Sequence, residues 1–230
     1  MGLFRKKRTK YGESGIVVSE GVRTKGAEGY NRLRDNILFL NADGKAKVIQ
    51  IESSTAGEGK TTTACNLAVS LGLTEKKVCV VDLDFRRPRV HRIFELSKDQ
   101  GIAEYVLGEV EADKVIKSTK YKNVDIITRG AEICNSTLVL MSERFKALMK
   151  ELRDTYDFVI VDCAPILQVS DYIHISKVTD GTLFLIAYAK TTKSQVAEAV
   201  KELTKNDGKI LGTVISMYDR KERDYNYYYY

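Results

Sequence analysis

A glycine-containing segment in the first third of the chain has the composition of a phosphate-binding loop. Residues 53–62 end in Gly-x-Gly-Lys-Thr-Thr, which matches the second half of the pattern G-x-x-x-x-G-K-[ST], although Ser54 stands where the first glycine is expected. Glycines allow backbone N–H groups to surround a phosphate, a lysine bridges the β- and γ-phosphates, and a hydroxyl binds Mg²⁺. The residues expected to bind nucleotide are Ala56, Gly57, Glu58, Gly59, Lys60, Thr61 and Thr62.

Two further segments place aspartates directly after apolar runs. Asp82 and Asp84 follow one such run, and Asp162 follows another. A buried carboxylate without a partner is costly, and a magnesium–phosphate site would remove that cost. The alternative is a structural network in which Arg86 and Arg87 pair with the first two aspartates.

Five of the last six residues are tyrosines, namely Tyr225, Tyr227, Tyr228, Tyr229 and Tyr230. An exposed aromatic run favours self-association, so one interpretation is a segment that adds to a neighbouring sheet or binds a partner. The other interpretation is a set of phosphate acceptors, whose full phosphorylation would add roughly −8 to −10 of charge. Such a change would make the tail a plausible assembly switch.

An alternation of apolar runs and helical patterns positions these segments. Strands are expected at 48–51, 78–81, 124–127, 158–161, 182–187 and 210–217, and helices at 28–40, 60–73, 142–156 and 194–205. Continuous apolar strands separated by helices predict a mostly parallel sheet in a three-layer α/β/α fold. Each chemical motif follows a strand, and ligands bind at the edge where parallel strands end.

Composition and charge narrow the class of protein. The chain has 230 residues, which suits one domain, and a formal net charge of +6. Five basic residues and no acid lie within the first ten positions, a pattern typical of a solvated arm or of an anionic membrane surface. No zinc-finger or helix–turn–helix pattern follows, so we expect no nucleic-acid partner.

The four cysteines show no C-x-x-C spacing and lie in or beside apolar runs. We expect Cys65, Cys79, Cys134 and Cys163 to be buried thiols in a reducing compartment. No signal peptide or membrane-spanning run is evident, which predicts a cytoplasmic protein. His91 and His174 are isolated and predict no metal cluster.

Taken together, the three motifs and the tail resemble the bacterial tyrosine kinases of capsule and exopolysaccharide systems, over almost the whole chain. The resemblance implies a P-loop NTPase fold in which Lys60 and Thr61 hold ATP and Mg²⁺. It further implies that Asp82 accepts the proton of the attacking tyrosine and contacts the metal, and that Asp84 and Asp162 complete the Mg²⁺ shell. The implied domains are a basic flexible arm at 1–25, the kinase domain at 26–217 and a flexible tyrosine-rich tail at 218–230.

The same resemblance implies a non-specific protein-tyrosine kinase that phosphorylates its own tail between subunits and regulates capsule or exopolysaccharide synthesis or export. Implied partners are a transmembrane polysaccharide co-polymerase that acts as activator, further copies of the chain in a homo-oligomer, and a tyrosine phosphatase. The kinase would be recruited to the inner face of the membrane. Thirteen residues follow Met217, which is about 40 Å of extended chain and enough to enter a neighbour's site.

Two departures from the family pattern stand out. In the E-x-x-R-x-x-R motif that builds subunit rings, Glu28 and Arg34 fit, but Asn31 replaces the middle arginine and Arg32 lies next to it. The stretch 135–142 lacks the proline and glutamate of N-P-[ST]-E-L-L-x-S, and Leu138 stands in place of the glutamate. These departures bear on assembly and regulation more than on ATP binding.

The main alternative is an ATP-driven positioning ATPase, like those that place plasmids or division septa. Those proteins share the fold and two of the motifs, but they carry a lysine near the start of the phosphate loop, where this chain has Thr55. They also give no reason for a tyrosine tail. A scaffold that binds nucleotide without transferring phosphate is a second alternative, which the intact Lys60 and aspartates disfavour.

Overall fold

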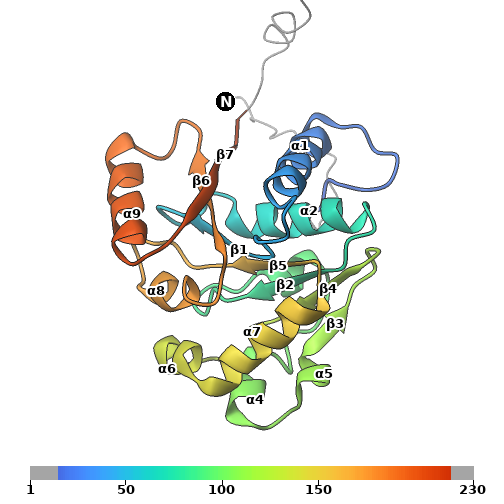
Figure 1. Cartoon of the computed structure of the whole chain (residues 1–230), viewed down its shortest axis with the longest axis vertical. Coiled ribbons are helices and arrows are strands. Elements are labelled where there is room, and N and C mark those ends of the chain that lie inside the picture. Colours follow the sequence, from blue (N-terminus) through green and yellow to red (C-terminus); the bar gives the residue numbers. More distant parts are fainter. Residues whose placement is uncertain (1–14, 219–230) are drawn as a thin grey trace, which may run out of the picture.

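A computed structural model describes residues 15–218 as a seven-stranded sheet between two layers of helices (Figure 1). The strand order is β3-β4-β2-β5-β1-β6-β7, and every neighbouring pair is parallel except β3 with β4. The strands are β1 (Val48–Ser53), β2 (Val78–Asp82), β3 (Ile116–Ser118), β4 (Val124–Ile127), β5 (Phe158–Asp162), β6 (Gly181–Ala187) and β7 (Ile210–Ser216).

The described helices range from one turn to four. They are α1 (Lys25–Leu40), α2 (Lys60–Gly72), α3 (Val90–Ile93), α4 (Ile102–Leu107), α5 (Ala112–Val115), α6 (Ser136–Met141), α7 (Glu143–Thr155), α8 (Asp171–Ile175) and α9 (Lys193–Lys205). Within residues 15–218, no helix has the length and apolar character needed to cross a membrane.

The central strands are buried on both faces because successive side chains point to opposite sides of the sheet. In β5, Phe158 and Ile160 pack into one hydrophobic cluster, while Val159 and Val161 pack into the other. This explains why the strands are continuously apolar in sequence rather than alternating.

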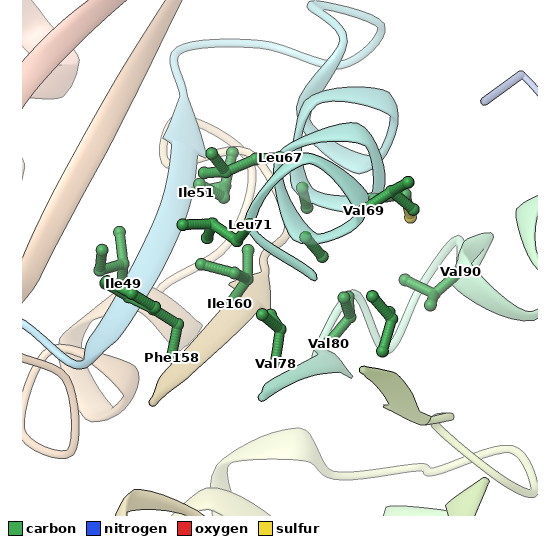
Figure 2. Packing of buried hydrophobic residues seen from close by; sticks show 14 of the residues in the cluster. Ile49, Ile51, Leu67, Val69, Leu71, Val78, Val80, Val90, Phe158 and Ile160 are labelled. Atoms are coloured by element: carbon green, nitrogen blue, oxygen red, sulfur yellow. The ribbon is translucent and has the colours of Figure 1, made fainter. Parts of the chain in front are cut away.

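Helix α2 covers the first face and forms the base of the phosphate loop. Leu67 and Leu71 lie over Ile49, Ile51 and Ile160 of the central strands, as Figure 2 shows. Because α2 begins directly after the loop, this packing fixes the position of the loop relative to the sheet.

Helix α7 covers the opposite face, and its amphipathic sequence accounts for its placement. The Ser142 hydroxyl caps the helix by accepting a hydrogen bond from Phe145 N, and Phe145, Leu148 and Leu152 are fully buried. On the same side, α8 and α9 cover β6, where Phe184 packs with Leu203.

The predicted fold class is confirmed, and each predicted helix and strand is present with small shifts at its ends. The sequence analysis did not predict β3 or the short helices α3, α4, α5, α6 and α8. Segments of three to six residues are too short to display a hydrophobic period, which explains why they were missed.

Part of the proposed N-terminal arm packs on the body of the protein. Val18 is buried, and Val17 N donates a hydrogen bond to Asn66 Oδ1 at 2.8 Å. Ordered packing therefore begins before residue 25. The basic cluster at the start of the chain and the tyrosines from 225 onward lie outside the described residues.

One cysteine prediction was wrong. Cys65, Cys79 and Cys163 are buried, whereas Cys134 is exposed. It lies in the irregular segment between β4 and α6, where a single neighbouring isoleucine did not indicate a core position.

Candidate active site

The candidate site lies at the carboxyl ends of three adjacent parallel strands. β2, β5 and β1 are neighbours, and they end in Asp82, Asp162 and the phosphate loop, respectively. Asp82 and Asp162 are directly opposite each other in the strand register. Three segments that lie far apart in sequence thus meet at one sheet edge, as ligand sites in parallel sheets require.

Two glycines give the phosphate loop its backbone shape. Gly57 and Gly59 have φ angles of +73° and +94°, which residues with a Cβ rarely adopt. Gly59 immediately precedes α2, so the free N–H groups of the helix N-terminus face the loop. This geometry is suited to holding a polyphosphate.

The predicted phosphate-binding lysine lies across the loop. Lys60 is only 6% exposed, and its Nζ donates a hydrogen bond to the Ser53 hydroxyl at 2.9 Å. Thr61 is half-buried and Thr62 is exposed at the start of α2. The ammonium group is thereby held at the end of β1, close to where a β- or γ-phosphate would lie.

The side chain of Glu58 has a structural role within the phosphate loop. Its carboxylate is fully buried and accepts hydrogen bonds from Thr55 N at 2.6 Å and from the Thr191 hydroxyl at 2.8 Å. It also accepts from the Thr55 hydroxyl and from Ala187 N. The side chain therefore joins the phosphate loop to the end of β6 and the segment after it, and leaves the backbone of Glu58 as the part available to a nucleotide.

Two residues from elsewhere in the fold also contact the phosphate loop, Lys190 after β6 and Ser216 at the end of β7. Lys190 Nζ donates hydrogen bonds to the carbonyl oxygens of Gly57 at 2.6 Å and Ala56 at 3.1 Å, and Ser216 Oγ donates to the carbonyl oxygen of Glu58 at 2.6 Å. The sequence analysis missed Lys190, Thr191 and Ser216, because they lie far along the chain and belong to no motif.

Asp82 and Asp84 both accept hydrogen bonds from the backbone that follows them. Asp82 Oδ2 accepts from Arg89 N and Val90 N, each at 3.1 Å. Asp84 Oδ1 accepts from Arg86 N at 3.2 Å and Arg87 N at 2.9 Å. The aspartates thus order this loop through its N–H groups, and not through the arginine side chains that the structural alternative invoked.

Asp162 is the least satisfied of the three carboxylates. It is fully buried, and neither oxygen has a hydrogen-bond partner in residues 15–218. Burial raises its pKa to about 7, although the nearby Thr61 hydroxyl and the Lys60 charge oppose the shift. Burial and the charge of Asp162 likewise raise the pKa of Asp82.

These unpartnered oxygens fit a magnesium site. Within residues 15–218, no three acidic, histidine or cysteine side chains converge as an all-protein metal cage would require. Mg²⁺ normally takes one or two carboxylates and completes its octahedral shell with phosphate and water. Asp162 and the Thr61 hydroxyl would hold the ion, with Asp82 and Asp84 beside them at the same edge.

A fourth acid, Glu52, was not anticipated from the sequence. It is fully buried in β1, neither carboxylate oxygen has a hydrogen-bond partner in residues 15–218, and burial raises its pKa to about 8 despite the charge of Lys60. A glutamate within an apolar strand, immediately before the phosphate loop, was the available signal.

A large open cavity of about 1060 Å³ lies over these groups. Its walls are the phosphate loop, the arginine-rich segment after β2, and residues from the loops that precede α6 and α8. Small-molecule sites typically measure about 300–1,000 Å³, so this volume is large enough for a nucleotide.

The segment 28–34, which departs from the family's E-x-x-R-x-x-R motif, makes hydrogen bonds within its own chain. Asn31 Oδ1 accepts hydrogen bonds from Ser70 Oγ at 2.8 Å and from Arg34 Nη1 at 3.3 Å, which ties α1 to α2. Leu138, at the second departure from the family pattern, is exposed on α6.

Comparison with known proteins gives the family. A family model described as an AAA domain matches residues 46–212. The chain is 33% identical to tyrosine-protein kinase YwqD of Bacillus subtilis over 226 residues, which cover 98% of this chain and 95% of that protein. It is 30% identical to tyrosine-protein kinase etk of Escherichia coli over 189 residues, which cover 82% of this chain but only 26% of that longer protein.

Solved structures agree with these matches. The chimerical protein CapA2B2 superimposes with a TM-score of 0.85 at 29% identity, covering 90% of this chain and 91% of that chain. The cell division ATPase MinD of Pyrococcus furiosus superimposes with a TM-score of 0.65 at 27% identity, covering 77% of this chain and 75% of that chain. The kinase relatives extend over more of the chain than the positioning ATPase does.

Proposed function

The chain belongs to the bacterial tyrosine-protein kinases, and from that premise we propose that it transfers the γ-phosphoryl group of ATP to its own tyrosines 225, 227, 228, 229 and 230. Nucleotide binding is common to this family of P-loop proteins. The identity of the nucleotide, the metal and the acceptor residues forms part of the proposal.

The adjacency of three strand ends is the observation that carries this proposal. The phosphate loop, Asp82 and Asp162 follow β1, β2 and β5, which are neighbours in the sheet. One nucleotide phosphate chain would lie along the loop and reach both carboxylates. Phosphoryl transfer depends chiefly on such positioning and on charge neutralisation.

The transfer step requires few covalent changes. The phenolic oxygen of a tyrosine forms a bond to the γ-phosphorus, the bond from that phosphorus to the bridging β–γ oxygen breaks, and ADP leaves with the electron pair. Asp82 would accept the phenolic proton as the general base. Bound Mg²⁺ would neutralise charge on the phosphates, held by Thr61, Asp84 and Asp162, while Lys60 contacts the β- and γ-phosphates.

We place the acceptor tail on a neighbouring copy of the chain. Thirteen residues follow Met217, and about 40 Å of extended chain suffices to reach a second molecule. The unperturbed pKa of a tyrosine hydroxyl is near 10, so a carboxylate base would assist the attack.

The partners follow from the same family membership. We propose a transmembrane polysaccharide co-polymerase as activator, which would recruit the kinase from the cytoplasm to the inner face of the membrane, and a tyrosine phosphatase that resets the tail. The several-fold greater length of the etk relative is consistent with kinases that carry additional regions in the same chain. Control of capsule or exopolysaccharide synthesis or export would be the outcome.

The experiment is to incubate the purified protein with Mg-ATP and to map phosphotyrosine by mass spectrometry. Lys60→Met should lose labelling because it removes the phosphate-binding ammonium, and a chain truncated after Asp224 should lose the acceptors. If the protein alone forms no phosphotyrosine, a fragment of the membrane activator is added.

A mixing control separates transfer between molecules from transfer within one. The Lys60→Met chain retains an intact tail but no active loop, whereas the truncated chain retains the loop but no tail. Phosphotyrosine on the Lys60→Met chain in the mixture supports transfer between subunits. Unchanged labelling of the Lys60→Met protein on its own would rule out the assigned site.

A further inference from the structure

Four arginines form one wall of the cavity above the phosphate loop. Arg86, Arg87, Arg89 and Arg92, which we name the arginine shelf, are exposed and line the cavity. Lys60 lines the same cavity, while Asp84 and Glu132 are the acids in its lining. The cavity is therefore strongly positive and suited to an anionic ligand.

The guanidinium groups of the arginine shelf are not held by direct contacts with the described protein, although the charge of Arg89 acts on Asp162. Within residues 15–218, none of the four guanidinium groups makes a hydrogen bond or an ion pair with the protein. Elsewhere, Arg144 donates to the carbonyl oxygen of Tyr105, Arg129 donates to that of Phe85, and Arg153 pairs with Asp180.

The neighbouring aspartates hold the shelf in place without neutralising it by direct pairing. Asp84 accepts from the N–H groups of Arg86 and Arg87, and Asp82 accepts from that of Arg89. The carboxylates thus order the backbone, and the arginine side chains project from a fixed loop. A preordered loop loses less conformational entropy when a ligand binds.

The nucleotide alone does not account for the shelf. A polyphosphate on the loop would be held by the N-terminus of α2 and by Lys60, on the side of the cavity formed by β1 and α2. The arginine shelf belongs to the segment after β2 and lines a different part of the same open cavity, whose volume of about 1060 Å³ lies at the upper end of the range for small-molecule sites. A second anionic group can therefore occupy the arginine side.

We propose that the arginine shelf is a binding subsite for phosphotyrosine, and that it recognises acceptor segments that already carry one phosphate beside the tyrosine to be modified. This inference rests on the proposed kinase function. Each phosphotyrosine carries a charge of about −1.5 to −2, and arginine binds phosphate in a bidentate manner. Four consecutive tyrosines at the end of this chain supply such neighbouring positions.

The consequence is ordered phosphorylation of the tail. The first transfer would be slow, because the unmodified segment offers the shelf only acidic residues such as Asp224. Each product then becomes a better ligand, so that later transfers are faster until the tail is highly charged.

The test measures binding separately from transfer. Two fluorescent peptides with the sequence of residues 222–230 are compared, one unmodified and one with phosphotyrosine at the position of Tyr230, on the full-length dephosphorylated protein loaded with Mg-ADP. We expect about tenfold tighter binding of the phosphorylated peptide at low salt, a factor that equals about 1.4 kcal/mol. The preference should weaken as salt concentration rises.

Variants assign the preference to the shelf. Arg86→Gln combined with Arg87→Gln should abolish the preference, and Arg92→Gln alone should reduce it, because all three side chains are exposed and unpaired in residues 15–218. As a control, Lys201→Gln combined with Lys205→Gln removes the same amount of charge from the exposed surface of α9, outside the cavity. This variant should keep the preference for the phosphorylated peptide. The affinity of each variant for a fluorescent ATP analogue should change less than twofold.

Three results would contradict the proposal that the arginine shelf binds phosphotyrosine. These are equal binding of the two peptides, an unchanged preference in both arginine variants, and a loss of nucleotide affinity in those variants that matches the loss of peptide affinity. A protein that prefers the phosphorylated peptide but forms no phosphotyrosine would contradict the proposed kinase function instead. If the protein phosphorylates its tail but binds both peptides equally, only the proposal for the arginine shelf is contradicted.

Discussion

Asp82 and Asp162 lie directly opposite each other at the ends of two adjacent parallel strands, and both are fully buried. Burial raises the pKa of each carboxyl group, and the charge of Asp162 raises the pKa of Asp82 further. Two buried carboxylates at one sheet edge destabilise the folded protein when both are ionised, and a bound cation would offset that cost. This relationship leads to the first prediction.

Asp162→Asn should stabilise the protein when Mg²⁺ and nucleotide are absent. The pKa of Asp162 is about 7 in the folded protein and near 4 when unfolded, so its contribution to stability is lost as the pH rises through about 7. At pH 8 the variant should therefore melt a few degrees above the wild type. Thermal unfolding in EDTA measures the difference.

Adding Mg-ADP should reverse the order of the melting temperatures of the wild type and the Asp162→Asn variant. The wild type should gain stability from Mg²⁺ beyond what ADP gives in EDTA, because ligand binding to the folded state raises the melting temperature. Asp162→Asn should lack that increment. An equal Mg²⁺ increment in both proteins would exclude Asp162 as a metal ligand.

Glu52→Gln should change the pH dependence of stability. Burial raises the pKa of Glu52 to about 8, above its value near 4 in the unfolded chain. The wild type therefore loses stability between about pH 5 and pH 8, because Glu52 is ionised in the unfolded chain but stays protonated in the folded protein. The free energy of unfolding of the variant, relative to that of the wild type, should rise by a few kcal/mol across this window.

Urea unfolding at several pH values in EDTA checks this result. A control substitution, Glu151→Gln, changes an exposed glutamate on α7 and should leave the pH profile as it is. If the difference between Glu52→Gln and the wild type is the same at pH 5 and pH 8, Glu52 is ionised in the folded protein throughout.

Glu58→Ala should destabilise the protein and weaken nucleotide binding. The substitution removes the acceptor for four hydrogen bonds, two from Thr55 within the phosphate loop and two from Ala187 and Thr191 across to the end of β6 and the segment that follows it. Unpaired buried donors cost about 1–3 kcal/mol each, so we expect a loss of about 2–4 kcal/mol. Thr191→Val removes one of these bonds and should cost about 1 kcal/mol.

Denaturant unfolding measures both losses, and titration with a fluorescent ATP analogue measures the effect on affinity. A Glu58→Ala protein with wild-type stability would show that the loop does not depend on this connection.

Cys134 should be the only rapidly reacting cysteine among the four. Cys65, Cys79 and Cys163 are buried, and burial raises the pKa of each, so little thiolate forms. An aromatic disulfide reagent added to the native protein should release one equivalent quickly and the remainder only in denaturant. Cys134→Ser should remove the fast phase of the reaction. Two or more rapidly reacting thiols in the native protein would contradict the burial of the other three cysteines.

The fold class and the identity of the phosphate loop could be predicted from sequence because both have local signatures. Apolar strands such as residues 158–161 lie between helical patterns, and the glycines of the loop stand at fixed positions before Lys60. The order of elements then implied a parallel sheet whose ligand edge carries Asp82, Asp84 and Asp162.

Strand order and the contacts across the site were decided by tertiary structure alone. Sequence did not reveal that β2, β5 and β1 are neighbours, that Glu58 bonds to Thr191 from 133 residues away, or that Cys134 lies on the surface. Such relationships depend on how helices pack the strands side by side, and their free energy comes from contacts between distant segments. Hydrophobic periodicity reports which face of an element is buried, but it does not report what the element is buried against.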